Sequence, residues 1–308
     1  MISYYFRGTG DDKPVKLDRF RAGAWVHVEA PNRAELEELS EKFDLDVDML
    51  GDALDPDEIP RLEVEDNLLY IYMRYAYRRA DTVDTDPVLL VVGSNFVVTV
   101  SRLPLPSFER LLSTTVLYTT QRPKLLLILL RYLVLSYESN LKLLDRTIRG
   151  VRAKLNVENI NNRDFIAFVV IEDALSSFQA ELVPESLLLQ GLLAGRYKLK
   201  FHEDDEDLIE DLVQATQQLI EASRSSLQTI VHIREAYGTI MANNLNKIFK
   251  MLTSITILMT IPTIVTSIYS MNIALPLMHN PMVFYVISLI ILAAMGIVGW
   301  WFKRNKWF

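Results

Sequence analysis

The feature that most constrains the fold of this chain is a long stretch without a single charged side chain. Residues 251–302 contain no Asp, Glu, Lys or Arg, which is a run of 52 residues in a chain of 308. A helix needs about 20 mostly apolar residues to cross the hydrocarbon core of a bilayer. The stretch therefore predicts two membrane-spanning helices, at 251–271 and 282–302, joined by a short turn at 272–281.

Basic residues flank both predicted spans, whereas the turn between them carries no charge. They are Lys247 and Lys250 before the first span, and Lys303, Arg304 and Lys306 after the second. Because Lys and Arg are enriched in cytoplasmic flanks, we expect both termini in the cytoplasm. The chain is then a two-span protein of the plasma (inner) membrane, with an external turn at 272–281 and a basic cytoplasmic tail at 303–308.

A stripe of hydroxyl side chains runs along the first predicted span. Its members recur at alternating steps of three and four, and they are Thr253, Thr256, Thr260, Thr263, Ser267 and Ser270. This spacing places them on one side of a helix. Any one of them is typical of a helix contact or of a bond to its own backbone. Six in register indicate a stripe that packs against other helices or faces water. Pro262 lies off the stripe and predicts a modest bend.

Composition excludes several classes of function. The chain has no Cys, so it has neither a disulfide framework nor a thiolate metal site. The net charge is -7, so the chain lacks the basic surface expected of a nucleic-acid-binding protein. The first residues show no signal-peptide pattern. No enzyme motif is present, so we expect no enzyme and no cofactor. The four histidines are interpreted as surface or packing residues: His27, His202, His232 and His279.

The residues before the spans predict a cytoplasmic α/β domain at 1–203 and a stalk helix at 204–250. The domain is expected to combine a mostly antiparallel sheet with long helices. Strands are predicted at 2–7, 24–28, 61–64, 68–77, 87–92 and 96–100, with turns between the last four, including one at 82–86. Helices are predicted at 31–43, 46–54, 122–155, 162–182 and 185–200. The long stalk helix should continue into the first span, and its length without a breaker favours packing against copies of itself.

The end of the first span resembles a known family. Tyr269 is followed by Ser270, Met271 and Asn272, and then by a second span and a basic tail. This pattern resembles the CorA-type magnesium and cobalt transporters, which have two spans and end the first with Gly-Met-Asn. Ser270 stands where that family has glycine. The resemblance implies a homopentamer in membrane lipid, with a pore lined by the first span. It also implies that Mg2+ is both substrate and regulatory ligand, with Co2+ and Ni2+ as alternative substrates.

Pore residues follow from this resemblance together with the stripe. The predicted pore and selectivity residues are Tyr269, Ser270, Met271, Asn272, Thr263, Thr260, Thr256 and Thr253. The predicted gate is formed by Phe249, Leu252 and Asn246, where apolar side chains can close a pore by dewetting. For Asn272 the alternative is a helix cap, a common position for Asn.

Two acids are assigned by counting back from the motif. Asp211 and Glu235 fall where CorA-type stalks carry the carboxylates that bind regulatory Mg2+, although Glu235 replaces the usual Asp. The alternative is that they are surface acids, paired with Arg234 or Lys247. The acidic run at 203–207 is interpreted as a solvated helix start.

Two other functions stay open at this stage. One is a ZntB-like zinc transporter with the same fold, and the other is a non-conducting membrane sensor of metal ions. The turn at 272–281 lacks the acidic residues that CorA-type turns often carry, which predicts weak ion entry or altered selectivity.

Overall fold

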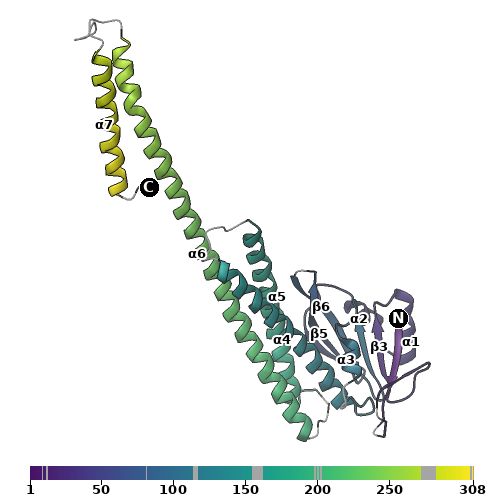
Figure 1. Ribbon diagram of the computed structural model, residues 1–308. Coiled ribbons are helices and arrows are strands. Elements are labelled where there is room, and N and C mark those ends of the chain that lie inside the picture. Colours follow the sequence, from purple (N-terminus) through teal and green to yellow (C-terminus); the bar gives the residue numbers. More distant parts are fainter. Residues whose placement is uncertain are drawn as a thin grey trace. The chain divides into compact units, whose positions relative to one another are not determined.

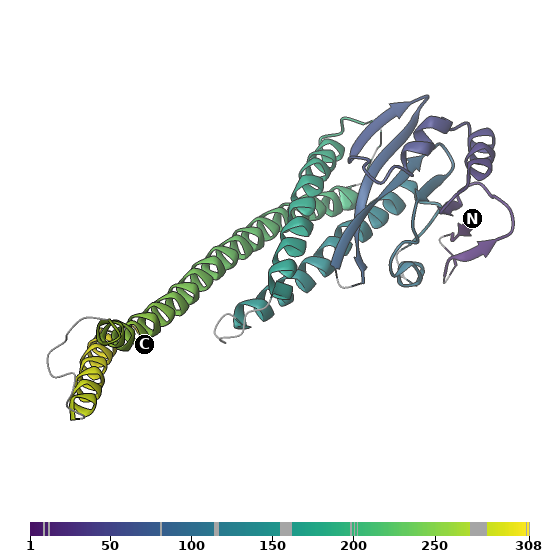
Figure 2. The same ribbon diagram turned by 90° about the horizontal axis from the view of Figure 1, so that it is seen from above.

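A computed structural model gives the structure of the chain and describes residues 1–8, 10–11, 13–80, 82–113, 117–154, 162–197, 199, 201, 203–271, 282–305 and 307. The chain divides into two compact units, Met1–Ile233 and Arg234–Phe308. The first contains a sheet with helices on both faces, and the second contains the long apolar helices (Figures 1 and 2).

Seven strands form one sheet in the first unit. Their order across the sheet is β2-β1-β3-β7-β6-β5-β4. The strands are β1 (Ile2–Phe6), β2 (Val15–Leu17), β3 (Trp25–Glu29), β4 (Arg61–Glu65), β5 (Leu68–Arg79), β6 (Thr82–Val92) and β7 (Val97–Ser101). Only the β3–β7 pair is parallel, and the other five pairs are antiparallel. This confirms the prediction of a mostly antiparallel sheet.

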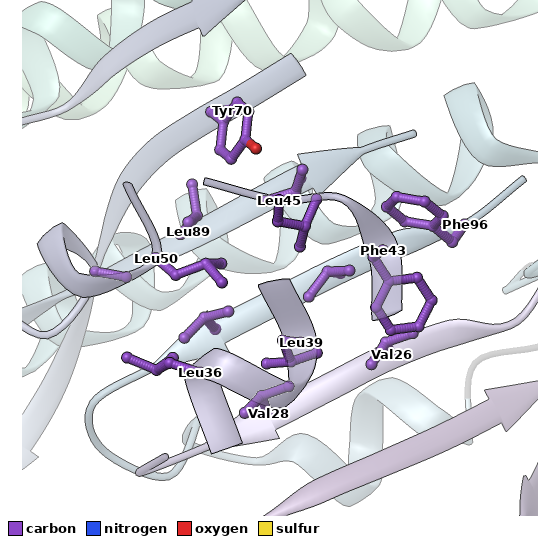
Figure 3. Close-up of a cluster of buried hydrophobic side chains, with 14 of the residues drawn as sticks. Val26, Val28, Leu36, Leu39, Phe43, Leu45, Leu50, Tyr70, Leu89 and Phe96 are labelled. Carbon is purple, nitrogen blue, oxygen red and sulfur yellow. The ribbon is translucent and has the colours of Figure 1, made fainter. Parts of the chain in front are cut away.

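One face of the sheet packs against two short helices, α1 (Arg33–Phe43) and α2 (Val47–Asp52). Successive strand residues point to opposite faces, so Tyr70 and Tyr72 of β5 both reach this core. Leu39 of α1 and Leu50 of α2 are fully buried against the sheet (Figure 3). Helix α1 begins at a capping box, in which Asn32 accepts a hydrogen bond from the Glu35 backbone and the Glu35 side chain accepts one in return.

The opposite face carries the long helices α4 (Arg122–Lys154) and α5 (Asn162–Leu193), with the short α3 (Phe108–Leu112) at its side. Asn140 of α4 donates to the Ala76 carbonyl of β5 over 3.0 Å. The first part of α6 (Glu203–Tyr269) adds a further layer. Ser223 of α6 donates to the Leu175 carbonyl of α5 over 3.1 Å, and Ser226 donates to the Asp145 carboxylate of α4 over 2.6 Å.

Helix α5 corrects the prediction of two helices at 162–182 and 185–200. It is a single helix through Pro184, even though a proline removes one backbone donor. Leu182 and Leu189 on either side are fully buried, so packing holds the helix together across the proline. The helix stops at Leu193 because Gly195 takes a left-handed conformation with a φ of 65°.

Other local differences also have physical reasons. Strand β6 begins at Thr82, whereas a turn was predicted at 82–86, because its partner β5 extends to Arg79 and pairs with it. Pro87 is tolerated within β6 since β7 pairs with β6 only from Val88 onward. Strand β2 and helix α3 were not predicted, and each has at most five residues.

The second unit consists of the remainder of α6 and of α7 (Met282–Arg304). Both helices are long and apolar enough to cross a membrane, with mean hydropathies of 1.8 and 2.5 in their most apolar windows. Helix α6 continues without interruption to Tyr269, including across Pro262. A long helix that runs into the first apolar segment is therefore confirmed.

Candidate ion pathway along helix α6

The hydroxyl stripe lies on an exposed side of α6. Every described member is exposed: Thr253, Thr256, Thr260, Thr263, Ser267 and Ser270. The less exposed residues of the same segment lie on the opposite side of the helix. These are Ser254, which is fully buried, and the half-buried Leu258, Ile261, Pro262 and Val265. The second unit therefore covers the side of α6 away from the stripe and leaves the stripe itself uncovered.

The stripe hydroxyls bond back to their own helix. Thr256, Thr260 and Thr263 donate to the carbonyls of Leu252, Thr256 and Met259, at 2.9, 2.8 and 2.9 Å. This is the bond predicted for a lone membrane hydroxyl. It uses the hydroxyl hydrogen, so the oxygen keeps lone pairs that accept hydrogen bonds. The exposed side of α6 thus presents acceptors and no charge.

At the end of α6, Ser270 stands where the CorA-type proteins described above have glycine. The Ser270 backbone donates to the Thr266 carbonyl over 3.0 Å, so helical bonding extends one residue past Tyr269. Ser270 does not have a positive φ, and a side chain is accommodated there without the strain that would favour glycine. Asn272 and the turn up to residue 281 lie outside the described residues.

The predicted gate residues lie at the start of the uncharged stretch, with Asn246 and Phe249 just before it and Leu252 at its second position. Phe249 is 62% exposed and Leu252 is 58% exposed, and Asn246 is also exposed. These large apolar side chains therefore have no packing partner sufficient to bury them within the chain. Burial of such residues requires another molecule or lipid.

The two predicted metal-binding acids are Asp211 and Glu235. Asp211 and Glu235 are both exposed, and they belong to different units of the chain. Among the described residues, no group of three or more His, Asp or Glu side chains is arranged to hold a metal ion.

Asp211 nevertheless lines a groove that the sequence did not predict. The groove has a volume of about 450 Å3 and lies between α4 and α6. Arg131, Glu138, Lys142 and Asp145 of α4 contribute polar side chains to it, as does Gln218 of α6, with apolar residues between them. Sequence spacing places residues on a helix face but does not say which helices pack together. The sequence therefore did not indicate that α4 forms the other side of this groove.

The histidines agree with their interpretation where the structure describes them. His27 is buried, stacks on Phe108 with ring centres 4.1 Å apart, and its Nδ1 lies 2.8 Å from the Thr99 hydroxyl. Burial lowers the pKa of His27, although the neighbouring Glu29 opposes that shift. His232 is exposed, whereas His202 and His279 lie outside the described residues.

Comparison with known proteins gives a consistent answer over nearly the whole chain. The family model of CorA-like Mg2+ transporter proteins matches residues 21–304. The cobalt/magnesium transport protein CorA of Methanocaldococcus jannaschii is 26% identical over 293 residues, which cover 92% of this chain and 90% of that protein.

Solved structures share the fold. The complete structure of the CorA magnesium transporter from Methanocaldococcus jannaschii matches with a TM-score of 0.85 and 23% identity, covering 100% of this chain and 99% of that chain. Full-length CmaX matches with a TM-score of 0.74 and 19% identity, covering 100% and 98%. The cytoplasmic domain of ZntB from Vibrio parahaemolyticus matches with a TM-score of 0.62 and 10% identity, covering 78% and 98%.

The exposed side of α6 can be tested by cysteine labelling, because the chain has no cysteine of its own. We expect Thr260→Cys in the membrane-embedded protein to react readily with a small, water-soluble thiol reagent. The control Val265→Cys, on the covered side, should react much more slowly. Burial in apolar surroundings raises a thiol pKa, and each unit lowers the thiolate fraction about tenfold. Equal rates for the two variants would contradict a water-facing stripe.

Proposed function

The chain belongs to the family of CorA-like Mg2+ transporter proteins, and on that premise we propose that it conducts Mg2+ through a pore formed by several copies of α6. The observation that carries the proposal is the uncovered hydroxyl stripe. One helix cannot enclose water, so the pore requires a closed homo-oligomer, for which we propose a pentamer. The protein acts as a channel and not as an enzyme.

The chemistry of the stripe suits a strongly hydrated cation. Mg2+ dehydrates reluctantly, and the waters around it direct their hydrogens outward. Hydroxyl oxygens such as those of Thr256, Thr260 and Thr263 accept these hydrogens without stripping the water shell. The membrane potential acts on the charge of the ion and supplies the driving force, about 4.6 kcal/mol for a divalent ion at 100 mV.

Topology completes the proposed pathway. We place both termini in the cytoplasm, because basic residues flank the two helices on the same side. The ion then enters near residue 272 and leaves past Phe249 and Leu252, which form the narrow apolar gate.

A reporter enzyme fused after Phe308 tests this orientation. A reporter that is active only in the cytoplasm should give a signal, and one that is active only outside should not. The reverse result would contradict the proposed direction of the pore.

The entrance is proposed to be a ring of Asn272 amides, one from each copy. Asn272→Ala should abolish Mg2+ flux in reconstituted vesicles and leave assembly intact, since it removes only the amides. Ser270→Gly is the control and should preserve flux or raise it, because glycine is the family's residue at this position. Full flux through a correctly assembled Asn272→Ala protein would rule out the ring.

Regulation by cytoplasmic Mg2+ is proposed to use Asp211 and Glu235 at contacts between copies. The double variant with Asp211→Asn and Glu235→Gln should stay open at internal Mg2+ levels that close the original protein. A contact with a charged group contributes about 1.5–3 kcal/mol, so the closing concentration should rise about tenfold or more. Glu210→Gln, an exposed neighbour on α6, is the matched control. An unchanged Mg2+ dependence of the double variant would show that these two acids play no part in closure.

A further inference from the structure

A buried cluster of charged residues joins the sheet to helix α5 in the first unit. Arg74 of β5 lies at its centre, and its Nε is 3.0 Å from a carboxylate oxygen of Glu181. The same Glu181 oxygen accepts a hydrogen bond from Thr85 of β6 over 2.5 Å. The other Glu181 oxygen accepts one from Tyr137 of α4 over 2.9 Å. Three elements therefore hold Glu181 in place.

A second carboxyl group lies one helical turn further along α5. Glu185 is completely buried, and one of its oxygens accepts a hydrogen bond from the Arg74 backbone over 2.8 Å. Its other oxygen is buried and has no hydrogen-bond partner among the described residues. An ionised carboxylate with an unpaired oxygen is costly in such a place, and a neutral carboxylic acid is much less so.

The charges around this cluster also favour a bound proton. Asp86 of β6 pairs with Arg102, and the charge of Arg74 also acts on Asp86. Two arginines thus face three carboxyl groups, which leaves one negative charge in excess unless a proton is bound. Tyr137 is uncharged and fully buried. Burial, which is the largest cause, raises the pKa of Glu181 and raises the pKa of Glu185 well above its ordinary value.

Solvent has a route to the cluster. Thr85 lines a pocket of about 230 Å3 between β6 and α5, together with Asp84, Asp173 and Ser177. The Thr85 hydroxyl bonds directly to Glu181. Glu181 is therefore one hydrogen bond from the wall of this pocket, and we infer that protons reach the glutamates from this side.

We propose that Glu181 and Glu185 together bind one proton at neutral pH, and that this proton stabilises the packing of α5 against the sheet. At alkaline pH the proton dissociates and the packing of α5 becomes looser. Loss of the proton leaves an uncompensated charge beneath the helix. Helix α5 also contacts α6, because the Ser223 hydroxyl donates to the Leu175 carbonyl, so looser packing of α5 would reach the helix that continues toward the membrane. The proposal concerns regulation by pH and does not depend on which ion is transported.

The direction of the pH effect follows from linkage. A carboxyl group whose pKa is raised in the folded state stabilises the fold fully below its unfolded pKa. That contribution is lost as the pH rises from the unfolded pKa toward the folded one. Within this window, the open population of α5 should increase by up to about tenfold per pH unit, the slope for one proton.

Hydrogen exchange of the full-length protein in lipid nanodiscs measures this opening. After correction for intrinsic exchange, the α5 amides around Glu185 should lose protection as the pH rises. Glu185→Gln keeps an amide oxygen for the Arg74 backbone but cannot ionise, and it should abolish the pH slope. Glu221→Gln, at an exposed position on α6, should keep it. An undiminished slope in a folded Glu185→Gln protein would overturn the proposal.

Infrared spectroscopy gives a second readout that does not need a stable variant. At neutral pH the unmodified protein should show the carbonyl band of a protonated, buried carboxylic acid, and the band should disappear on alkaline titration. The folded variants Glu185→Gln and Glu221→Gln then assign it, since only the first should remove it. Absence of any such band from the unmodified protein at neutral pH would overturn the shared proton.

Discussion

Hydrocarbon neither solvates a charge nor satisfies an unpaired backbone group, and this constraint governs the C-terminal part of the chain. Residues 251–302 meet it with side chains that carry no formal charge, and α6 and α7 meet it with backbone bonds made within each helix. The hydroxyls of α6 obey the same rule, because Thr256, Thr260 and Thr263 bond to carbonyls of their own helix. These three threonines make one side of the helix polar and bond their hydroxyl hydrogens within the helix.

The same helix explains why the chain should act as part of an oligomer. The covered side of α6 contains Ser254 and Val265, whereas the stripe and the large side chains of Phe249 and Leu252 are exposed. A polar stripe beside exposed apolar residues is stable in a membrane when copies of the helix surround a common axis. Transport would then be a property of the assembly, in which each chain contributes one helix to the wall of the pore.

The sequence was sufficient to predict the elements whose residue pattern is local. Short runs bounded by turn signals predicted most of the strands, and the uncharged run predicted both apolar helices. It was insufficient where packing overrides a local rule, as at Pro184, where burial of Leu182 and Leu189 keeps α5 continuous. It also could not show that Glu181 and Glu185 face Arg74, because that contact joins residues more than 100 positions apart. The hydroxyl stripe on α6 was predictable from its spacing, but whether it lines a pore depends on copies of the chain.

Measuring ion flux through the purified protein in vesicles is the most direct test of whether the chain forms a Mg2+ channel. With a potential that is negative inside, the account predicts Mg2+ uptake that is lost when the potential is removed. Zn2+ uptake without Mg2+ uptake would instead indicate a ZntB-like transporter. No flux of either ion through a correctly assembled protein would contradict the account and favour a membrane sensor that binds metal without conducting it.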